Sequence, residues 1–207
     1  YVGQAIYFCK LIEQRYKWFK DTLMNKVINK KVVITGGPGT GKTSVIKELI
    51  SNGYHCYDEG SRDIISRINL KGKTFKSDPL TFSDSLYKAR AKHYVDSQEK
   101  GYNMNTVFFD RGIHDILAYL RYIKKNNKYW EDMISKYKYD TVFVFPPWKE
   151  IYTTDDERQE DFKESKGVNN EIIKVYKESN SDIIEIPKMT VEKRAKFILN
   201  HLFNNEK

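Results

Sequence analysis

Residues 36–43 read Gly36-Gly37-Pro38-Gly39-Thr40-Gly41-Lys42-Thr43. This stretch has the required residue at every fixed position of G-x-x-x-x-G-K-[ST], the P-loop pattern of proteins that bind nucleoside triphosphates. A short β-branched, apolar run over residues 31–35 predicts a buried strand before it, and the helical spacing over residues 44–50 predicts a helix after it. The pattern therefore lies where its chemistry requires it, between a strand and a helix N-terminus.

The loop predicts a phosphate site, because N–H groups at a helix N-terminus and the helix dipole both favour an anion. Glycines lack Cβ and let the backbone wrap closely around phosphates. In this pattern Lys42 is the point charge for the β- and γ-phosphates, and the Thr43 hydroxyl is the expected Mg²⁺ ligand. We expect ATP to contact Gly36, Gly37, Pro38, Gly39, Thr40, Gly41, Lys42, Thr43 and Ser44. The alternative is a glycine-rich turn that binds nothing.

Composition sets the broad class. The chain has 207 residues, of which 40% are hydrophobic and 31% charged, enough for one α/β domain with an ordinary core. Its two cysteines, Cys9 and Cys56, form no C-x-x-C pair, which fits a reducing cytoplasm and argues against a disulfide scaffold or a zinc site. No apolar run is long enough for a membrane span, and charges interrupt the first residues too early for a signal peptide.

The formal net charge of +8 is consistent with a nucleic-acid surface or with a lysine-rich solvated surface and a pocket for anionic substrates. The basic residues are scattered, and no aromatic-basic motif of an RNA-binding module occurs. We therefore favour the second interpretation.

Alternating apolar and periodic segments predict the fold. Strands are expected over residues 31–35, 54–58, 106–110, 141–145 and 183–186, and helices over 44–50, 61–68, 79–100, 114–124, 130–137, 170–179 and 191–203. Strands that alternate with helices indicate a parallel sheet covered on both faces. We predict a three-layer α/β P-loop NTPase fold, with a five-stranded parallel sheet and helices on both faces.

The first 23 residues stand apart. Their loosely amphipathic spacing predicts a helix, and Met24 lies just ahead of the first strand. We expect residues 1–23 to be an extension or a start-site artefact, and residues 24–207 to form the P-loop domain with a lid segment at about 148–166.

Asp110 ends an apolar strand, as does the acid of the second phosphate-site motif of P-loop proteins, and could hold Mg²⁺ directly or through water. Its alternative role is to cap the next helix. The following residue is Arg111, where a motor ATPase usually places a glutamate that polarises water. An arginine there suits a transferring phosphoryl group or an anionic acceptor.

Two further segments could supply catalytic groups. After the second strand, Glu59 could accept the proton of an attacking hydroxyl, with Asp58 as second choice, and Arg62 could reach the same pocket. The alternative is an acidic helix start with an ion pair. In the polar segment after the fourth strand, Arg158 is either a lid arginine that stabilises transition-state charge or an exposed residue at a helix start.

Three other positions have weaker signals. Arg90 lies mid-helix and could reach an acceptor substrate, but a surface arginine is the simpler interpretation. Trp148 and the two prolines before it are better explained as a packing hinge than as a base-stacking site. Residues 187–190 could support a purine ring or form a plain turn before the last helix.

Together these segments resemble the P-loop AAA-domain family related to the ribosylnicotinamide kinase domain of NadR. The resemblance runs from about Lys31 to Leu202 and is carried by GGPGTGKTSVIKEL, YDEGSRDIISR, FFDRGIHDILAYL, VFVFPPWKEIYTTDDERQEDF and VEKRAKFIL. It implies a five-stranded kinase-type sheet with ATP and Mg²⁺ as ligands.

The resemblance also carries residue roles. Lys42 and Thr43 match its phosphate and metal positions. Its strand-two acid and arginine are Glu59 and Arg62, its strand-three pair is Asp110 and Arg111, and its lid arginine is Arg158. One departure is His114, where relatives often have proline, which weakens the case for a role of Asp115.

The leading hypothesis is an Mg-ATP-dependent phosphotransferase acting on a small hydroxyl-bearing acceptor such as a nucleoside or riboside. The alternative is a nucleotide-dependent switch, an ATPase or GTPase that binds a protein or lipid partner. No Asn-Lys-x-Asp guanine reader occurs, which favours ATP over GTP. A nucleic-acid-linked ATPase rests on net charge alone. The acceptor and the oligomeric state are not determined by the sequence.

Overall fold

The computed structural model describes residues 15, 29–58, 78–152 and 161–204. In chain order its elements are β1 (Lys30–Gly36), α2 (Lys42–Ser51), β2 (His55–Tyr57), α4 (Pro79–Glu99), the 3₁₀ helix η1 (Asn103–Asn105), β3 (Thr106–Asp110), α5 (His114–Tyr122), α6 (Lys128–Ile134), β4 (Thr141–Phe145), the 3₁₀ helix η2 (Lys149–Ile151), α7 (Phe162–Glu178), β5 (Asp182–Glu185) and α8 (Val191–Phe203).

The strands form one five-stranded parallel sheet in the order β2-β3-β1-β4-β5. The central strand β1 pairs with β3 on one side and β4 on the other, so that Ile34 lies opposite Asp110 and Gly36 opposite Phe145. The predicted fold class is confirmed. In a sheet of this kind, ligands bind at the carboxyl ends of the strands where the strand order reverses, and that point is the end of β1.

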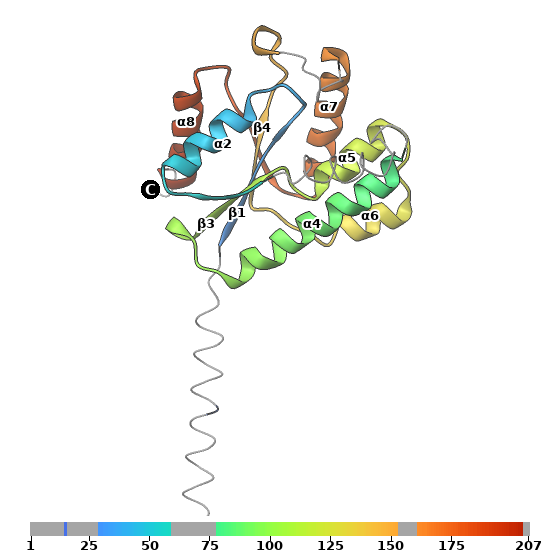
Figure 1. Cartoon of the computed structure of the whole chain (residues 1–207), viewed down its shortest axis with the longest axis horizontal. Coiled ribbons are helices and arrows are strands. Elements are labelled where there is room, and N and C mark those ends of the chain that lie inside the picture. Colours follow the sequence, from blue (N-terminus) through green and yellow to red (C-terminus); the bar gives the residue numbers. More distant parts are fainter. Residues whose placement is uncertain (1–14, 16–28, 59–77, 153–160, 205–207) are drawn as a thin grey trace, which may run out of the picture.

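Side chains alternate between the two faces of the sheet, because successive strand residues point to opposite sides. Val32 and Ile34 pack with α2 and α8, whereas Val33 packs with α4, α5 and α7. Figure 1 shows this layering, with α2 and α8 on one side of the strands and α4, α5, α6 and α7 on the other.

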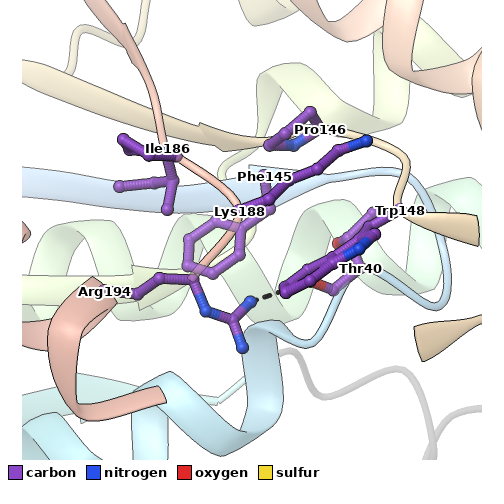
Figure 2. A pocket seen from close by; sticks show the side chains of 8 residues that line it. Thr40, Phe145, Pro146, Trp148, Ile186, Lys188 and Arg194 are labelled. Atoms are coloured by element: carbon purple, nitrogen blue, oxygen red, sulfur yellow. Dashed lines mark hydrogen bonds between the residues drawn. The ribbon is translucent and has the colours of Figure 1, made fainter. Parts of the chain in front are cut away.

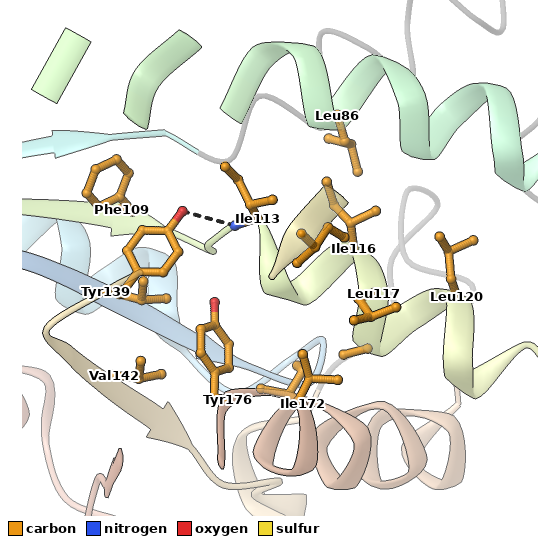
Figure 3. Close-up of a cluster of buried hydrophobic side chains, with 14 of the residues drawn as sticks. Leu86, Phe109, Ile113, Ile116, Leu117, Leu120, Tyr139, Val142, Ile172 and Tyr176 are labelled. Atoms are coloured by element: carbon orange, nitrogen blue, oxygen red, sulfur yellow. Dashed lines mark hydrogen bonds between the residues drawn. The ribbon is translucent and has the colours of Figure 1, made fainter. Parts of the chain in front are cut away.

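The side of the core next to α5 and α7 contains buried aromatic side chains that carry polar atoms. Tyr139 and Tyr176 lie side by side there, with ring centroids 6.4 Å apart, and the Tyr139 hydroxyl accepts a hydrogen bond from the Ile113 N–H at 3.1 Å (Figure 3). His114 stacks on Tyr176 at 5.0 Å and is only 2% exposed. Neither nitrogen of this imidazole has a hydrogen-bond partner in the described structure.

Most predicted elements are found close to their predicted bounds, and the strands at 106–110 and 141–145 and the helix at 191–203 have the predicted ends. The prediction that a helix begins at Asn170 was wrong, since α7 begins at Phe162. Asp161 accepts a hydrogen bond from the Glu164 N–H at 2.7 Å, and the Glu164 carboxylate accepts one from the Asp161 N–H at 2.9 Å. This capping box starts the helix two turns earlier.

α4 begins as predicted, with Asp78 as its N-cap and Pro79 at its first position. At its other end, the Asn29 side-chain amide donates to the carbonyls of Ser97 and Lys100, at 2.9 and 2.5 Å. The end of α4 is therefore tied to the residue that precedes β1. Within the described ranges, no helix combines the length and apolarity that a membrane crossing requires.

The buried imidazole of His114 predicts a pH-dependent stability. Burial lowers its pKa from 6.5 to about 4, against a smaller opposing effect of the nearby Asp115 charge. The unfolded chain therefore takes up this proton at higher pH than the folded chain. The stabilising contribution is complete above pH 6.5 and is lost as the pH falls towards 4, by up to about 3 kcal/mol.

His114→Phe keeps a ring at this position and removes the titration. We expect the free energy of unfolding, measured with urea at several pH values, to fall less steeply in this variant between pH 6.5 and 4 than in the wild type. Equal slopes for the two proteins would contradict the assignment.

Candidate functional site

The P-loop surrounds the ammonium group of Lys42, and the residue as a whole is only 7% exposed. Its Nζ donates to the carbonyls of Gly36 at 3.1 Å and Gly37 at 2.8 Å, and to the Thr40 hydroxyl at 3.2 Å. The lysine is therefore fixed inside the loop and is held by oxygens of the loop itself.

Three other side chains, each from a distant part of the chain, donate to carbonyl groups of the loop. Arg111 Nη1 donates to Gly36 at 3.0 Å, Ser165 Oγ to Pro38 at 2.8 Å, and Arg194 Nη1 to Thr40 at 3.2 Å. Carbonyl oxygens repel an anion, and these donors occupy them. The first N–H groups of α2 have no acceptor within the helix, so the end of the loop can offer them to an anion.

α7 packs directly on the P-loop through one of its faces. Asn169 is buried, and its side-chain oxygen accepts a hydrogen bond from the Gly37 N–H at 3.3 Å. Ser165, four residues earlier, lies on the same face of the helix and holds Pro38. Two consecutive loop residues are therefore fixed by one helix.

The β3 end approaches the same loop. The Arg111 N–H donates to the Ile34 carbonyl at 3.0 Å, and Arg111 has a φ of 67°, in the left-handed region that side chains other than glycine rarely adopt. Asp110 is half-buried beside β1. It does not cap α5, whose N-cap position is Ile113 without a side-chain cap. The capping alternative for Asp110 was therefore wrong.

Asp115 lies next to this arginine and is 5% exposed. Its carboxylate accepts hydrogen bonds from the Thr35 hydroxyl, from Arg111 Nη1 at 3.2 Å, from the Gly112 N–H at 3.1 Å and from the Tyr176 hydroxyl at 2.7 Å. The group connects β1, the β3–α5 turn and α7.

A shallow pocket flanks the loop at the ends of β4 and β5 (Figure 2). It is lined by Thr40, Phe145, Pro146, Trp148, Ile186, Pro187, Lys188 and Arg194. The Arg194 guanidinium lies over the rings of Phe145 and Trp148, at 5.5 and 5.6 Å, and its Nε has no hydrogen-bond partner in the described structure. These side chains leave no room for even a water molecule, so a planar ligand could enter only if one of them moved.

A magnesium ion would find oxygen donors here. The Thr43 hydroxyl belongs to the exposed first turn of α2, and the Asp110 carboxylate ends β3. Hydroxyl and carboxylate oxygens are ligands that Mg²⁺ prefers, and it usually adds substrate phosphates and water to one or two protein ligands. The residues present fit the ion by donor chemistry. No group of three or more His, Cys, Asp or Glu side chains gathers into a metal site in the parts described.

Three of the predicted site residues, Glu59, Arg62 and Arg158, lie outside the described residues. The other predicted site residues lie at or next to the carboxyl end of β1. They are residues 36–44, Asp110 and Arg111. Asp58, the second choice for a base, is exposed directly after β2. Of the lid segment at 148–166, residues 149–151 form η2 and residues 162–166 belong to α7.

The sequence pattern of a known family, described as an AAA domain, matches residues 31–194. This chain belongs to the AAA domain family. No curated protein matches the chain in sequence.

Solved structures share the fold of this AAA domain. A deoxyadenosine kinase from M. mycoides with bound dATP has a TM-score of 0.66 and 14% identity, over 84% of this chain and 99% of that one. NadR in complex with NR has a TM-score of 0.65 and 16% identity, over 87% of this chain and 52% of that one. Thymidylate kinase from Candida albicans has a TM-score of 0.64 and 17% identity, over 86% of this chain and 92% of that one. The fold is therefore that of P-loop kinases.

Sequence reasoning missed Ser165, Asn169 and Arg194, and it discounted Asp115 because of the departure at His114. The spacing of Arg111 and Asp115, one helical turn apart, was an available signal for an ion pair. Arg90 was misinterpreted as a surface residue: it is 4% exposed and donates to the Gly112 carbonyl at 3.0 Å. Ser165 and Asn169 carried no signal, because only the fold brings α7 to the loop.

The contact between Asn169 and the loop can be tested by hydrogen exchange. In Asn169→Ala the Gly37 N–H loses its acceptor, so we expect this amide to exchange faster and the free energy of unfolding to fall by about 1 kcal/mol. Asn170→Ala is the matched control, because Asn170 is the exposed neighbour on the same helix. Identical exchange at Gly37 in the two variants would refute the contact.

Proposed function

We propose that this chain is an Mg-ATP-dependent phosphotransferase that acts on a small hydroxyl-bearing acceptor, with a nucleoside or riboside as the first class to test. The observation that carries the proposal is the position of Arg111. Its guanidinium donates to the first carbonyl of the P-loop, next to the loop that would hold the phosphates. A cation there stabilises charge on a transferring phosphoryl group, whereas a hydrolytic motor places a water-polarising acid at this point.

The described residues supply the part of the site that would bind ATP, the phosphoryl donor. Lys42 would neutralise the β- and γ-phosphates, and the first N–H groups of α2 would donate to their oxygens. Thr43 and Asp110 would hold Mg²⁺, which supplies further positive charge to the phosphates when it is bound. In a phosphoryl transfer such positioning and charge stabilisation account for most of the catalysis.

The acceptor half rests on residues predicted from the sequence. Glu59 would take the proton of the acceptor hydroxyl as its oxygen attacks the γ-phosphorus and the β–γ bridging oxygen leaves with ADP. Arg62 and Arg111 would contact the acceptor or the phosphoryl group, and Arg158 would add charge from a lid. The kinases with this fold include one named for deoxyadenosine, a nucleoside, which supports this class of acceptor.

Transfer is tested by γ-labelled ATP, Mg²⁺ and a panel of nucleosides and ribosides that includes nicotinamide riboside. We expect label in an organic product. Lys42→Ala and Glu59→Gln should each lower transfer by about 10²-fold or more, because they remove a phosphate charge and a general base. The controls are Lys47→Ala, an exposed lysine of α2, and Glu99→Gln, an exposed acid at the end of α4.

The outcomes separate the hypotheses. Label found only as free phosphate would favour the nucleotide-dependent switch or an ATPase, and full activity of Glu59→Gln would show that the base is another group. Stimulation of turnover by DNA or RNA would revive the nucleic-acid-linked ATPase.

The pocket beside Thr40 is the proposed position of the ATP base. Trp148 and Phe145 offer aromatic faces, and Arg194 offers an N–H that has no acceptor in the described structure. Burial disfavours a charged group, and it lowers the pKa of Arg194. A base that stacks on these rings and accepts from Nε would compensate part of that cost. This proposal gives Trp148 a stacking role in place of the hinge role favoured by the sequence.

Tryptophan emission tests the base pocket. A ring that enters beside Trp148 must displace or stack on the indole, so we expect ATP to change the emission of the wild type and to leave that of Trp148→Phe unchanged. The chain has three tryptophans, so the variant still emits through Trp130 and Trp18. An equal change in both proteins would place the base elsewhere.

A further inference from the structure

Asp115 has no part in the mechanism above, although it is bound to several elements of the site. It lies on the first turn of α5, one helical turn after Arg111, and it is almost fully buried. Its partners come from β1, the β3–α5 turn and α7: they are the Thr35 hydroxyl, the Gly112 N–H, the Arg111 guanidinium and the Tyr176 hydroxyl. Thr35 is the residue directly before the P-loop.

The chemistry of these partners defines the carboxyl group as an acceptor. The Arg111 and Gly112 groups can only donate. Burial raises the pKa of Tyr176 well above its ordinary value, so its hydroxyl stays protonated and donates as well. The Asp115 carboxylate is therefore the common acceptor of these donors, one of which is a guanidinium nitrogen 3.2 Å away.

The same nitrogen of Arg111 has a second acceptor. Arg111 Nη1 lies 3.0 Å from the Gly36 carbonyl oxygen and 3.2 Å from Asp115 Oδ1. Arg111 has a left-handed backbone, with a φ of 67°, and its guanidinium contacts the end of β1. An unusual backbone at a non-glycine residue costs energy and persists where surrounding contacts hold it. Here Asp115 and the loop supply two of those contacts.

We infer that Asp115 is a positioning residue for phosphoryl transfer: anchored by Thr35, Gly112 and Tyr176, it holds the Arg111 guanidinium against the start of the P-loop. The inference rests on the proposed function, in which Arg111 contacts the transferring group. Arginine has a flexible side chain, and a fixed guanidinium loses no rotamer freedom when the phosphates arrive. Tyr176 extends this support to α7, which also holds Gly37 and Pro38.

A double-mutant cycle separates positioning from a general structural effect. The variants are Asp115→Asn, Arg111→Ala and the double variant, and the measurement is kcat/KM for ATP with an acceptor from the panel. If Asp115 acts through Arg111, Asp115→Asn should lower kcat/KM about 30-fold in the wild type. The same change should lower it less than about threefold in the Arg111→Ala background. The same factor in both backgrounds would overturn the inference.

A pair of tyrosine variants keeps the test decisive if Asp115→Asn does not fold. Tyr176→Phe removes a donor to Asp115, whereas Tyr139→Phe removes a buried hydroxyl that bonds to the Ile113 N–H 3.1 Å away and that has no hydrogen bond to Asp115 in the described structure. Both lie in the same cluster (Figure 3). We expect kcat to fall several-fold more in Tyr176→Phe than in Tyr139→Phe at similar losses of stability. Equal kcat values in the two variants would contradict the positioning role.

The result can be told apart from a failure of the proposed function. If the wild type transfers label to no acceptor, the phosphotransferase proposal fails. The double-mutant cycle is then measured with the Kd for Mg-ATP in place of kcat/KM. Non-additive losses in Kd would still support a unit of Asp115 and Arg111 at the P-loop. Additive losses, or no effect of Asp115→Asn on Kd, would refute it.

Discussion

The pairing of β1 with β3 is the constraint on which the site depends. The register sets Ile34 opposite Asp110, so the residue after Asp110 comes to the start of the P-loop. The hydrogen bond from the Arg111 N–H to the Ile34 carbonyl extends this pairing by one residue. A shift of one residue along the strands would exchange the two faces of the sheet. It would also move both the acid and the arginine away from the loop.

The fold could be predicted from the sequence because its signals are local. Apolar β-branched runs define β1, β3 and β4, and the Gly-rich octapeptide fixes a strand-loop-helix unit at the start of the domain. The carboxyl end of β1 could likewise be predicted as the site, since parallel sheets bring such ends to one edge. Lys42 and Arg111 were found by their position in motifs, and the structure has both beside Gly36.

The parts that escaped prediction depend on contacts between distant segments. The sequence around Arg90 and Asp115 does not reveal that both are buried. Two of the partners of Asp115, Thr35 and Tyr176, come from β1 and α7, and Arg90 donates to the entry turn of another helix. The early start of α7 was different in kind. Its signal, an acid at 161 with a glutamate three residues later, is local, but the charged residues around it suggested a loop.

α7 contacts the site at three points that lie along one stripe. Ser165 and Asn169 touch the P-loop, and Tyr176 touches Asp115, with the core residue Ile172 between them. Their spacing of four, three and four residues keeps them in phase with the helix. Inserting or deleting one residue between positions 169 and 176 would rotate one end of this stripe by about 100° relative to the other. The segment therefore tolerates changes of side chain on its outer face but not changes of length, and α7 ties the loop and the acid to one rigid body.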